Sequence, residues 1–177
     1  MYKPASLRRH LAATVPDLQT NPDKLSIFVR QGRTLCAGGA SLSFEYAYTV
    51  QVVVLDFAGE PDHIMLPLLV WLRTHQREYF DNPETRAQAL RFEAEYLNAS
   101  TLDLTIELDL TERVAVAVQD PDDHDAPGRF TLQHLGEPPA VDHIDLPGVW
   151  ELYDRETLVA TWTTSPLDTD HAPRLAS

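Results

Sequence analysis

The side chains best suited to chemistry lie in one acidic run, Asp122-Asp123-His124-Asp125, whose carboxylates and imidazole could together bind a metal ion. Neighbouring ligands crowd one another, however, and the run lacks the alternating ligands, central glycine and terminal glutamate of a calcium-binding loop. We therefore interpret the run as a solvated acidic loop and keep a small metal-dependent hydrolase as an alternative function.

The rest of the sequence lacks the motifs that indicate a catalytic or cofactor-binding site. Gly38-Gly39 has no P-loop lysine after it, and no Gly-x-Ser-x-Gly elbow occurs. Cys36 is the only cysteine, which excludes an internal disulfide, and we expect it to be a small buried apolar residue. We predict no catalytic residue, no metal ligand and no cofactor, and thus a protein that is not an enzyme and works by binding.

The net charge of −13 is concentrated in the second half of the chain. Residues 1–97 carry 10 basic and 11 acidic side chains, whereas residues 98–177 carry 4 basic and 16 acidic ones. An acidic surface repels phosphates, so nucleic acid is not expected as a partner. The charge serves either solubility or association with a basic protein surface. No apolar run reaches the roughly 18 residues of a membrane span, so no membrane contact is expected.

Two small groups of residues are candidates for a protein interface. Lys3, Arg8 and Arg9 lie in a short amphipathic helix predicted near the N-terminus. They form either a solvated helix face or a docking contact with an acidic partner. Trp150 and Trp162 lie on a predicted C-terminal hairpin, where they either anchor an interface or pack on their own domain.

Apolar residues at every second position predict the main strands. The alternation is clearest from Leu102 to Leu110 and continues to Val118. Further strands are predicted at residues 25–30, 44–54 and 90–96. The short turn before Leu102 indicates that strand 90–96 forms an antiparallel hairpin with the strand that follows it.

These strands and two helices predict an α+β fold, with a mostly antiparallel sheet and two helices packed on one of its faces. The second helix is expected at residues 62–79, where Pro67 marks a kink or the first turn. The predicted organisation is a main α+β domain at 1–118, an acidic, proline-rich linker or insertion with a short strand near Phe130 to Leu135 at 119–148, a C-terminal β-hairpin at 149–163 and a flexible tail at 164–177.

A series of short segments runs through nearly the whole chain in a specific order and spacing. The segments are Lys3-Pro4, Ser6-Leu7-Arg8-Arg9, Asn21-Pro22-Asp23, Ile27-Phe28-Val29, Gly32, Ser41-Leu42-Ser43-Phe44-Glu45, Tyr48-Thr49, Asp56-Phe57, Gly59, Asp62, Pro67, Trp71-Leu72-Arg73, Gln76, Leu108, Leu110-Thr111-Glu112-Arg113, Glu151-Leu152-Tyr153, Leu158-Val159 and Trp162. Together they resemble the tail completion protein R family of contractile-tailed temperate phages and prophages. The stretch from Gln119 to Val149 is longer and more acidic than in that family.

The resemblance implies a tail-terminator-like fold and a structural virion protein that completes or caps the head-proximal end of a phage tail, so that the head can join. It implies a homo-oligomer, expected as a hexameric ring because tail rings are sixfold. Its expected partners are tail tube and sheath proteins and head-completion or neck proteins. The expected location is the virion tail, after assembly in the bacterial host cytoplasm. A head-side neck or adaptor protein remains the alternative, and the family supplies no catalytic residues.

Overall fold

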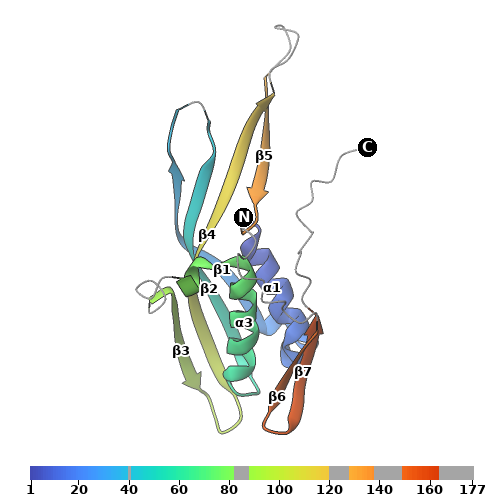
Figure 1. Ribbon diagram of the computed structural model, residues 1–177. Coiled ribbons are helices and arrows are strands. Elements are labelled where there is room, and N and C mark those ends of the chain that lie inside the picture. Colours follow the sequence, from blue (N-terminus) through green and yellow to red (C-terminus); the bar gives the residue numbers. More distant parts are fainter. Residues whose placement is uncertain (40, 82–87, 120–127, 138–148, 164–177) are drawn as a thin grey trace.

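The computed structural model spans residues 1–177 and describes all of them except 40, 82–87, 120–127, 138–148 and 164–177 (Figure 1). The described elements, in chain order, are α1 (Lys3–Thr14), α2 (Pro16–Thr20), the 3-10 helix η1 (Pro22–Lys24), β1 (Leu25–Cys36), β2 (Phe44–Phe57), α3 (Asp62–His75), α4 (Glu78–Asp81), β3 (Leu90–Tyr96), β4 (Leu102–Gln119), β5 (Arg129–Leu135), β6 (Val149–Asp154) and β7 (Thr157–Thr163). Within them, no helix is both long and apolar enough to cross a membrane.

The main sheet is antiparallel throughout and has the strand order β1-β2-β4-β3. β5 pairs with the far end of β4, from Arg113 to Gln119, whereas β3 pairs with its near end, from Leu102 to Leu108. The hairpin predicted for residues 90–96 and the following strand is therefore confirmed. β4 is a single long strand because its alternation of apolar and polar residues continues with little interruption.

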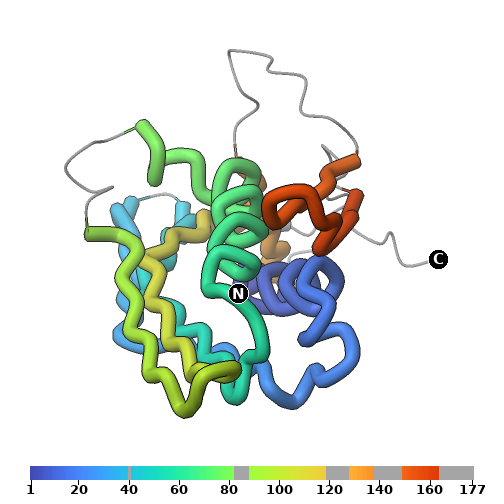
Figure 2. The backbone as a smooth tube through the Cα atoms, turned by 90° about the horizontal axis from the view of Figure 1, so that it is seen from below, coloured from blue at the N-terminus to red at the C-terminus, as the bar shows by residue number. Residues whose placement is uncertain are grey.

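Helices α1 and α3 cover one face of this sheet, as Figures 1 and 2 show. The alternate apolar residues of β2 and β4 point toward the helices, and the α+β prediction is confirmed. Burying a leucine or isoleucine stabilises the fold by about 1.5–3 kcal/mol each. The fully buried core residues on these elements are Leu7, Leu11, Val50, Val52, Val54, Ile64, Leu68, Leu72, Leu104 and Ile106.

The two helices begin and end for local reasons. In α1 the ring of Pro4 occupies the first turn, where a missing N–H costs no helical hydrogen bond. Extended Val15, just before Pro16, ends the helix. α3 contains Pro67 and stops at His75, short of the predicted end, because Gln76 leaves helical geometry with φ of −150°.

The hairpin β1–β2 differs from its prediction. β1 extends beyond Arg30 to Cys36, and a bulge between Arg30 and Gly32 shifts its register against β2. The far end of this hairpin projects beyond the helices (Figure 1), so none of the described elements forms a second layer over it. Cys36 is exposed there, and the prediction of a buried cysteine is wrong for that reason.

Two elements follow the long acidic segment. The strand predicted near Phe130 to Leu135 is β5, which extends the main sheet through β4. The C-terminal hairpin is β6–β7, a separate two-stranded sheet that contacts α1 and packs against Val70 of α3. The predicted linker and tail boundaries fall on or beside residues 120–127, 138–148 and 164–177, which lie outside the described residues, and stay predictions.

Candidate assembly interfaces

A buried carboxylate, that of Glu112, joins the start of α1 to β4. Glu112 is only 2% exposed. Its oxygens accept hydrogen bonds from the backbone N–H groups of Tyr2 and Lys3, at 2.9 and 3.1 Å, and from the hydroxyl of Tyr48. Nδ1 of His134 on β5 lies 3.3 Å from the same carboxylate. The first N–H groups of a helix lack helical partners and carry partial positive charge, so the carboxylate stabilises the start of α1.

The ammonium group of Lys3 is buried next to this carboxylate. Lys3 is 1% exposed, and its Nζ donates to Gln76 Oε1 and Glu137 Oε1, each at 2.8 Å. Burial lowers the pKa of Lys3, and the carboxylates of Glu137 and Glu112 oppose this shift. The solvated helix face expected for Lys3 is not found, because its charge is paired inside the chain. We call Lys3, Tyr48, Gln76, Glu112, His134 and Glu137 the Glu112 cluster.

The side chain of Gln76 fills a gap in the edge of β4. β3 pairs with β4 as far as Leu108 and β5 starts to pair at Arg113, so no described strand pairs with the segment between them on that side. The N–H of Thr111 donates to Gln76 Oε1 at 3.1 Å, and Gln76 Nε2 donates to the Thr111 hydroxyl at 3.1 Å. One side chain thus supplies the missing backbone hydrogen bond and links α3 to the sheet.

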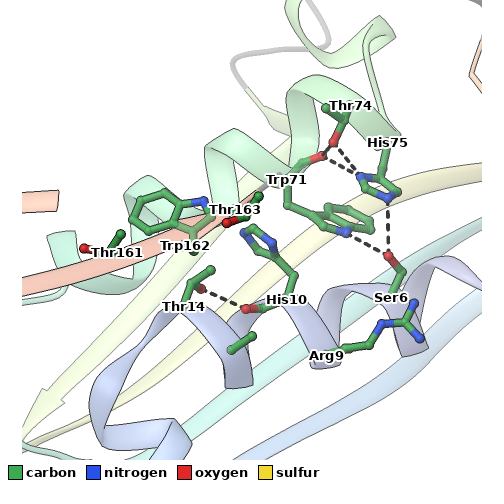
Figure 3. A pocket seen from close by; sticks show the side chains of 11 residues that line it. Ser6, Arg9, His10, Thr14, Trp71, Thr74, His75, Thr161, Trp162 and Thr163 are labelled. Atoms are coloured by element: carbon green, nitrogen blue, oxygen red, sulfur yellow. Dashed lines mark hydrogen bonds between the residues drawn. The ribbon is translucent and has the colours of Figure 1, made fainter. Parts of the chain in front are cut away.

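A cleft of about 490 Å³ lies between α1, α3 and β7 (Figure 3). In its wall, Trp71 Nε1 donates to the hydroxyl of Ser6 at 3.2 Å, and Ser6 Oγ lies 3.3 Å from His75 Nε2. The rings of Trp71 and His75 stack with their centres 4.4 Å apart. These contacts join α1 to the C-terminal turn of α3.

A serine beside a histidine has the arrangement of a nucleophile and its base. Ser6 is only 4% exposed, however, and its hydroxyl already accepts the indole N–H of Trp71. Nδ1 of His75 lies 2.7 Å from the hydroxyl of Thr74 and 3.0 Å from the backbone carbonyl of Trp71, so contacts within α3 orient the ring. We interpret Ser6 as a residue that holds the two helices together.

The two N-terminal arginines contact different parts of the chain from Lys3 and from each other. Arg8 donates to the carbonyl oxygens of Leu25 and Pro22, at 2.7 and 3.4 Å, and so holds the start of β1. Arg9 lines the cleft beside α3 and β7. The three basic residues therefore do not form one surface, and a docking role for Arg8 or Arg9 stays a prediction.

The two tryptophans of the C-terminal hairpin lie opposite each other, Trp150 on β6 and Trp162 on β7. Trp162 is 6% exposed and packs with Val70, Leu152 and Ala160, while Trp150 is partly buried against the same group. The indole N–H of Trp162 has no hydrogen-bond partner in the described structure. Packing on its own chain is thus observed for Trp162, and an interface role for either residue stays a prediction.

The outer strands of the main sheet, β1 and β3, present open edges of opposite charge. β1 contains Arg30 and Arg33 and no acidic residue. β3 contains Glu93, Glu95 and Arg91, and the guanidinium of Arg91 is held by two carboxylates of β4, at 3.4 and 3.1 Å. The edge at β3 is therefore left acidic and the edge at β1 basic.

The hairpin β4–β5 extends beyond the helices (Figure 1), and several of its apolar side chains are exposed. Val118 pairs with Phe130, and both are more than half exposed, at 59% and 64%. Leu132, which pairs with Val116, is 63% exposed. Contiguous exposed apolar residues of this kind are typical of a surface that contacts another protein.

The acidic run at residues 122–125 lies outside the described residues. In the part of the chain that the structure does describe, no group of three or more histidine, cysteine, aspartate and glutamate side chains is placed to hold a metal ion.

The sequence analysis missed Tyr48, Gln76 and Glu112 as members of a shared site. One feature could have found Glu112, because it occupies a position at which the alternation of β4 requires an apolar residue. A charged residue at such a position needs buried partners. Nothing local indicates that those partners are Lys3 and Tyr48.

Comparison with known proteins bears on what these surfaces do. A family model described as P2 phage tail completion protein R (GpR) matches residues 1–138. The Tail completion protein R of Escherichia phage P2 is 40% identical over 162 residues, which cover 92% of this chain and 99% of that protein. No solved structure matches the chain. The chain belongs to the P2 phage tail completion protein R family.

Proposed function

We propose that this chain is a structural virion protein that completes a phage tail and caps its head-proximal end, so that the head can join. The observation that carries the proposal is the 40% identity to a tail completion protein over nearly the full length of both chains. The protein would act by contact rather than by catalysis, in the virion tail, after assembly in the host cytoplasm.

The proposed working form is a cyclic homo-oligomer, a hexameric ring that matches the sixfold symmetry of the tail. Cyclic rings are built from head-to-tail interfaces, in which two different surfaces of the same chain meet. The two open edges of the main sheet support this form, because an open edge offers unpaired backbone groups to a neighbouring strand. The exposed apolar face of β4–β5 is a further surface that assembly would cover.

The proposed partners of the ring are the tail tube and sheath proteins below it and the head-completion or neck proteins above it. Purified protein should bind isolated tails and should not bind heads that lack a neck. The reverse preference would contradict a tail cap and favour a head-side adaptor.

A genetic test addresses the function directly. Particles assembled without the chain should accumulate as separate heads and tails, and purified protein added to the lysate should restore joined particles. Joined, infectious particles formed in its complete absence would overturn the proposal. Native mass measurement and negative-stain images would test the ring, which a strict monomer in the presence of tail tubes would contradict.

A further inference from the structure

We propose that the basic edge strand β1 of one copy pairs with the acidic edge strand β3 of the next, as an antiparallel pair with Arg30 opposite Glu95 and Arg33 opposite Glu93. This inference rests on the proposed ring and names the surfaces that close it. The occupant of each edge is a second copy of this chain.

The charges on the two edges are complementary and lie on one face of the sheet. Arg30 and Arg33 pair with Thr49 and Ala47 of β2, on the face without helices. Glu93 and Glu95 pair with β4 residues on that same face. In the described structure none of the four charged side chains forms an ion pair. Arg30 donates to Gln51 Oε1, at 3.1 and 2.7 Å, but this partner is neutral and leaves the charge of Arg30 uncompensated. Opposite charges on adjacent strands stabilise a sheet, whereas like charges destabilise it.

The strand directions fit a ring. Each strand in the order β1-β2-β4-β3 is antiparallel to the one before it, so β1 and β3 run in opposite directions. Rotation about the ring axis leaves unchanged the component of each strand's direction that lies along that axis. β1 of one copy then meets β3 of the next in antiparallel orientation, and the sheet continues from copy to copy.

The bulge in β1 brings the two arginines into register with the two glutamates. Arg30 and Arg33 are three residues apart, a spacing that would place them on opposite faces of a regular strand. Because the bulge adds one residue between Arg30 and Gly32, their partners on β2 are only two residues apart. Glu93 and Glu95 are also two residues apart, so both pairs form in one register.

The same register places apolar side chains together on the face that the helices cover. Val29 on β1 falls opposite Tyr96 on β3, and these side chains are 42% and 69% exposed. Phe92, which is 59% exposed, falls opposite Thr34. The pairing thus covers apolar surface that β3 leaves open beside α3.

The register also fixes the inclination of the strands. Within one copy, Arg30 pairs with Thr49 of β2, which in turn pairs with Asp109 of β4. Glu95 pairs with Asp103 of β4. The two edge residues that would meet in the ring are therefore offset by six residues along β4. Six residues span about 20 Å along a strand, and the four strands of one copy span about 19 Å across the sheet. Closing a ring with this offset inclines the strands by about 45° to its axis, close to the inclination in closed barrels.

Charge reversal tests the contact. Arg30→Glu with Arg33→Glu should weaken ring assembly by about tenfold or more, and adding Glu93→Arg with Glu95→Arg should restore it. The control is Arg73→Glu with Arg155→Glu, which makes the same change in net charge at exposed positions off both edges. The proposal would be overturned if the edge variant and the control lost ring assembly equally, or if the fourfold variant did not regain it.

A cross-link gives a second readout that does not depend on the reversed variants folding. In a Cys36→Ser background, Arg30→Cys with Glu95→Cys should form disulfide-linked ladders on oxidation, because residues opposite each other in a sheet lie within disulfide reach. Arg30→Cys with Arg73→Cys is the control. If the variant completes tails but forms no more disulfide-linked oligomers than the control, the pairing of β1 with β3 is contradicted and the tail-cap function is not. Failure of the wild-type chain to complete tails would instead overturn that function.

Discussion

Replacing Glu112 with alanine removes one buried carboxylate that accepts three hydrogen bonds. The buried ammonium of Lys3 would lose a nearby opposite charge, and two N–H groups at the start of α1 would lose their acceptor. We expect the free energy of unfolding to fall by about 3 kcal/mol. The control is Glu107→Ala, on the exposed face of the same strand, which should cost less than about 1 kcal/mol. Equal effects in denaturant titrations would contradict the importance of the Glu112 cluster.

The phenol of Tyr48 gives the cluster a signature at high pH. Burial and the hydrogen bond to Glu112 raise the pKa of Tyr48 above its ordinary value of 10.0. Above pH 10 the unfolded phenol ionises while the folded one stays protonated, so the folded state binds more protons and loses stability as the pH rises. Tyr48→Phe should cost about 1–2 kcal/mol at neutral pH, and this difference from wild type should shrink by about 1.4 kcal/mol per pH unit above 10.

Chemical denaturation of both proteins at a series of pH values between 7 and roughly 11 measures that difference. The titration of Lys3 contributes to both proteins and cancels in the comparison. A difference that stays constant up to the highest pH would show that Tyr48 ionises normally in the folded protein.

Single residues were the hardest feature to predict from the sequence. Lys3 reads as one of three basic residues on a helix, yet its partners Gln76 and Glu137 are 73 and 134 residues away in the chain. Only the folded sheet brings them together. The motifs that carry the family resemblance include Lys3, Tyr48, Gln76 and Glu112, each in a separate motif. In the structure these four residues belong to one buried hydrogen-bonded cluster.

At the scale of elements, hairpin β6–β7 packs on Val70 of α3 through a cluster that contains Trp162, Leu152 and Ala160. Trp162→Ala should lower the free energy of unfolding by about 3 kcal/mol and speed hydrogen exchange in β6 and β7. Tyr153→Ala is the matched control, an aromatic residue of the same hairpin that is 52% exposed, and it should have little effect. If Trp162→Ala left stability intact and abolished assembly, the indole would instead be an interface anchor.

The alternation of residues predicted β2 and β4 well, because each has one face on the core and one face away from it. It also predicted β3, although only Leu90 of that strand is partly buried. It failed for residues 31–36 of β1, where apolar and polar residues do not alternate. The end of α3 was also missed, because helix propensity continues past His75 while the contact between Gln76 and β4 stops the helix. The order of the strands depends on long-range pairing, and no local pattern encodes it.

The whole molecule carries a net charge of −13, so copies of this chain repel one another before they meet. Most charges on two approaching copies are separated by more than the screening length, which is about 10 Å at 0.1 M salt, so added salt screens this repulsion strongly. The proposed contacts of Arg30 and Arg33 with their partners act only at short range. Assembly is therefore a balance between a long-range repulsion, which salt screens strongly, and a local attraction, which salt weakens less.

The two contributions can be separated by comparing variants of equal net charge. Raising the salt from about 0.05 M to about 0.5 M should strengthen assembly of Arg30→Glu with Arg33→Glu the most, because repulsion then acts both over the molecule and across the edge. Arg73→Glu with Arg155→Glu has the same net charge but keeps the edge attraction, so its assembly should gain less. Mass distributions measured across the salt series give, for each variant, the slope of ring assembly against salt concentration. Equal slopes would mean that net charge alone controls assembly and that the edge arginines meet no acidic strand.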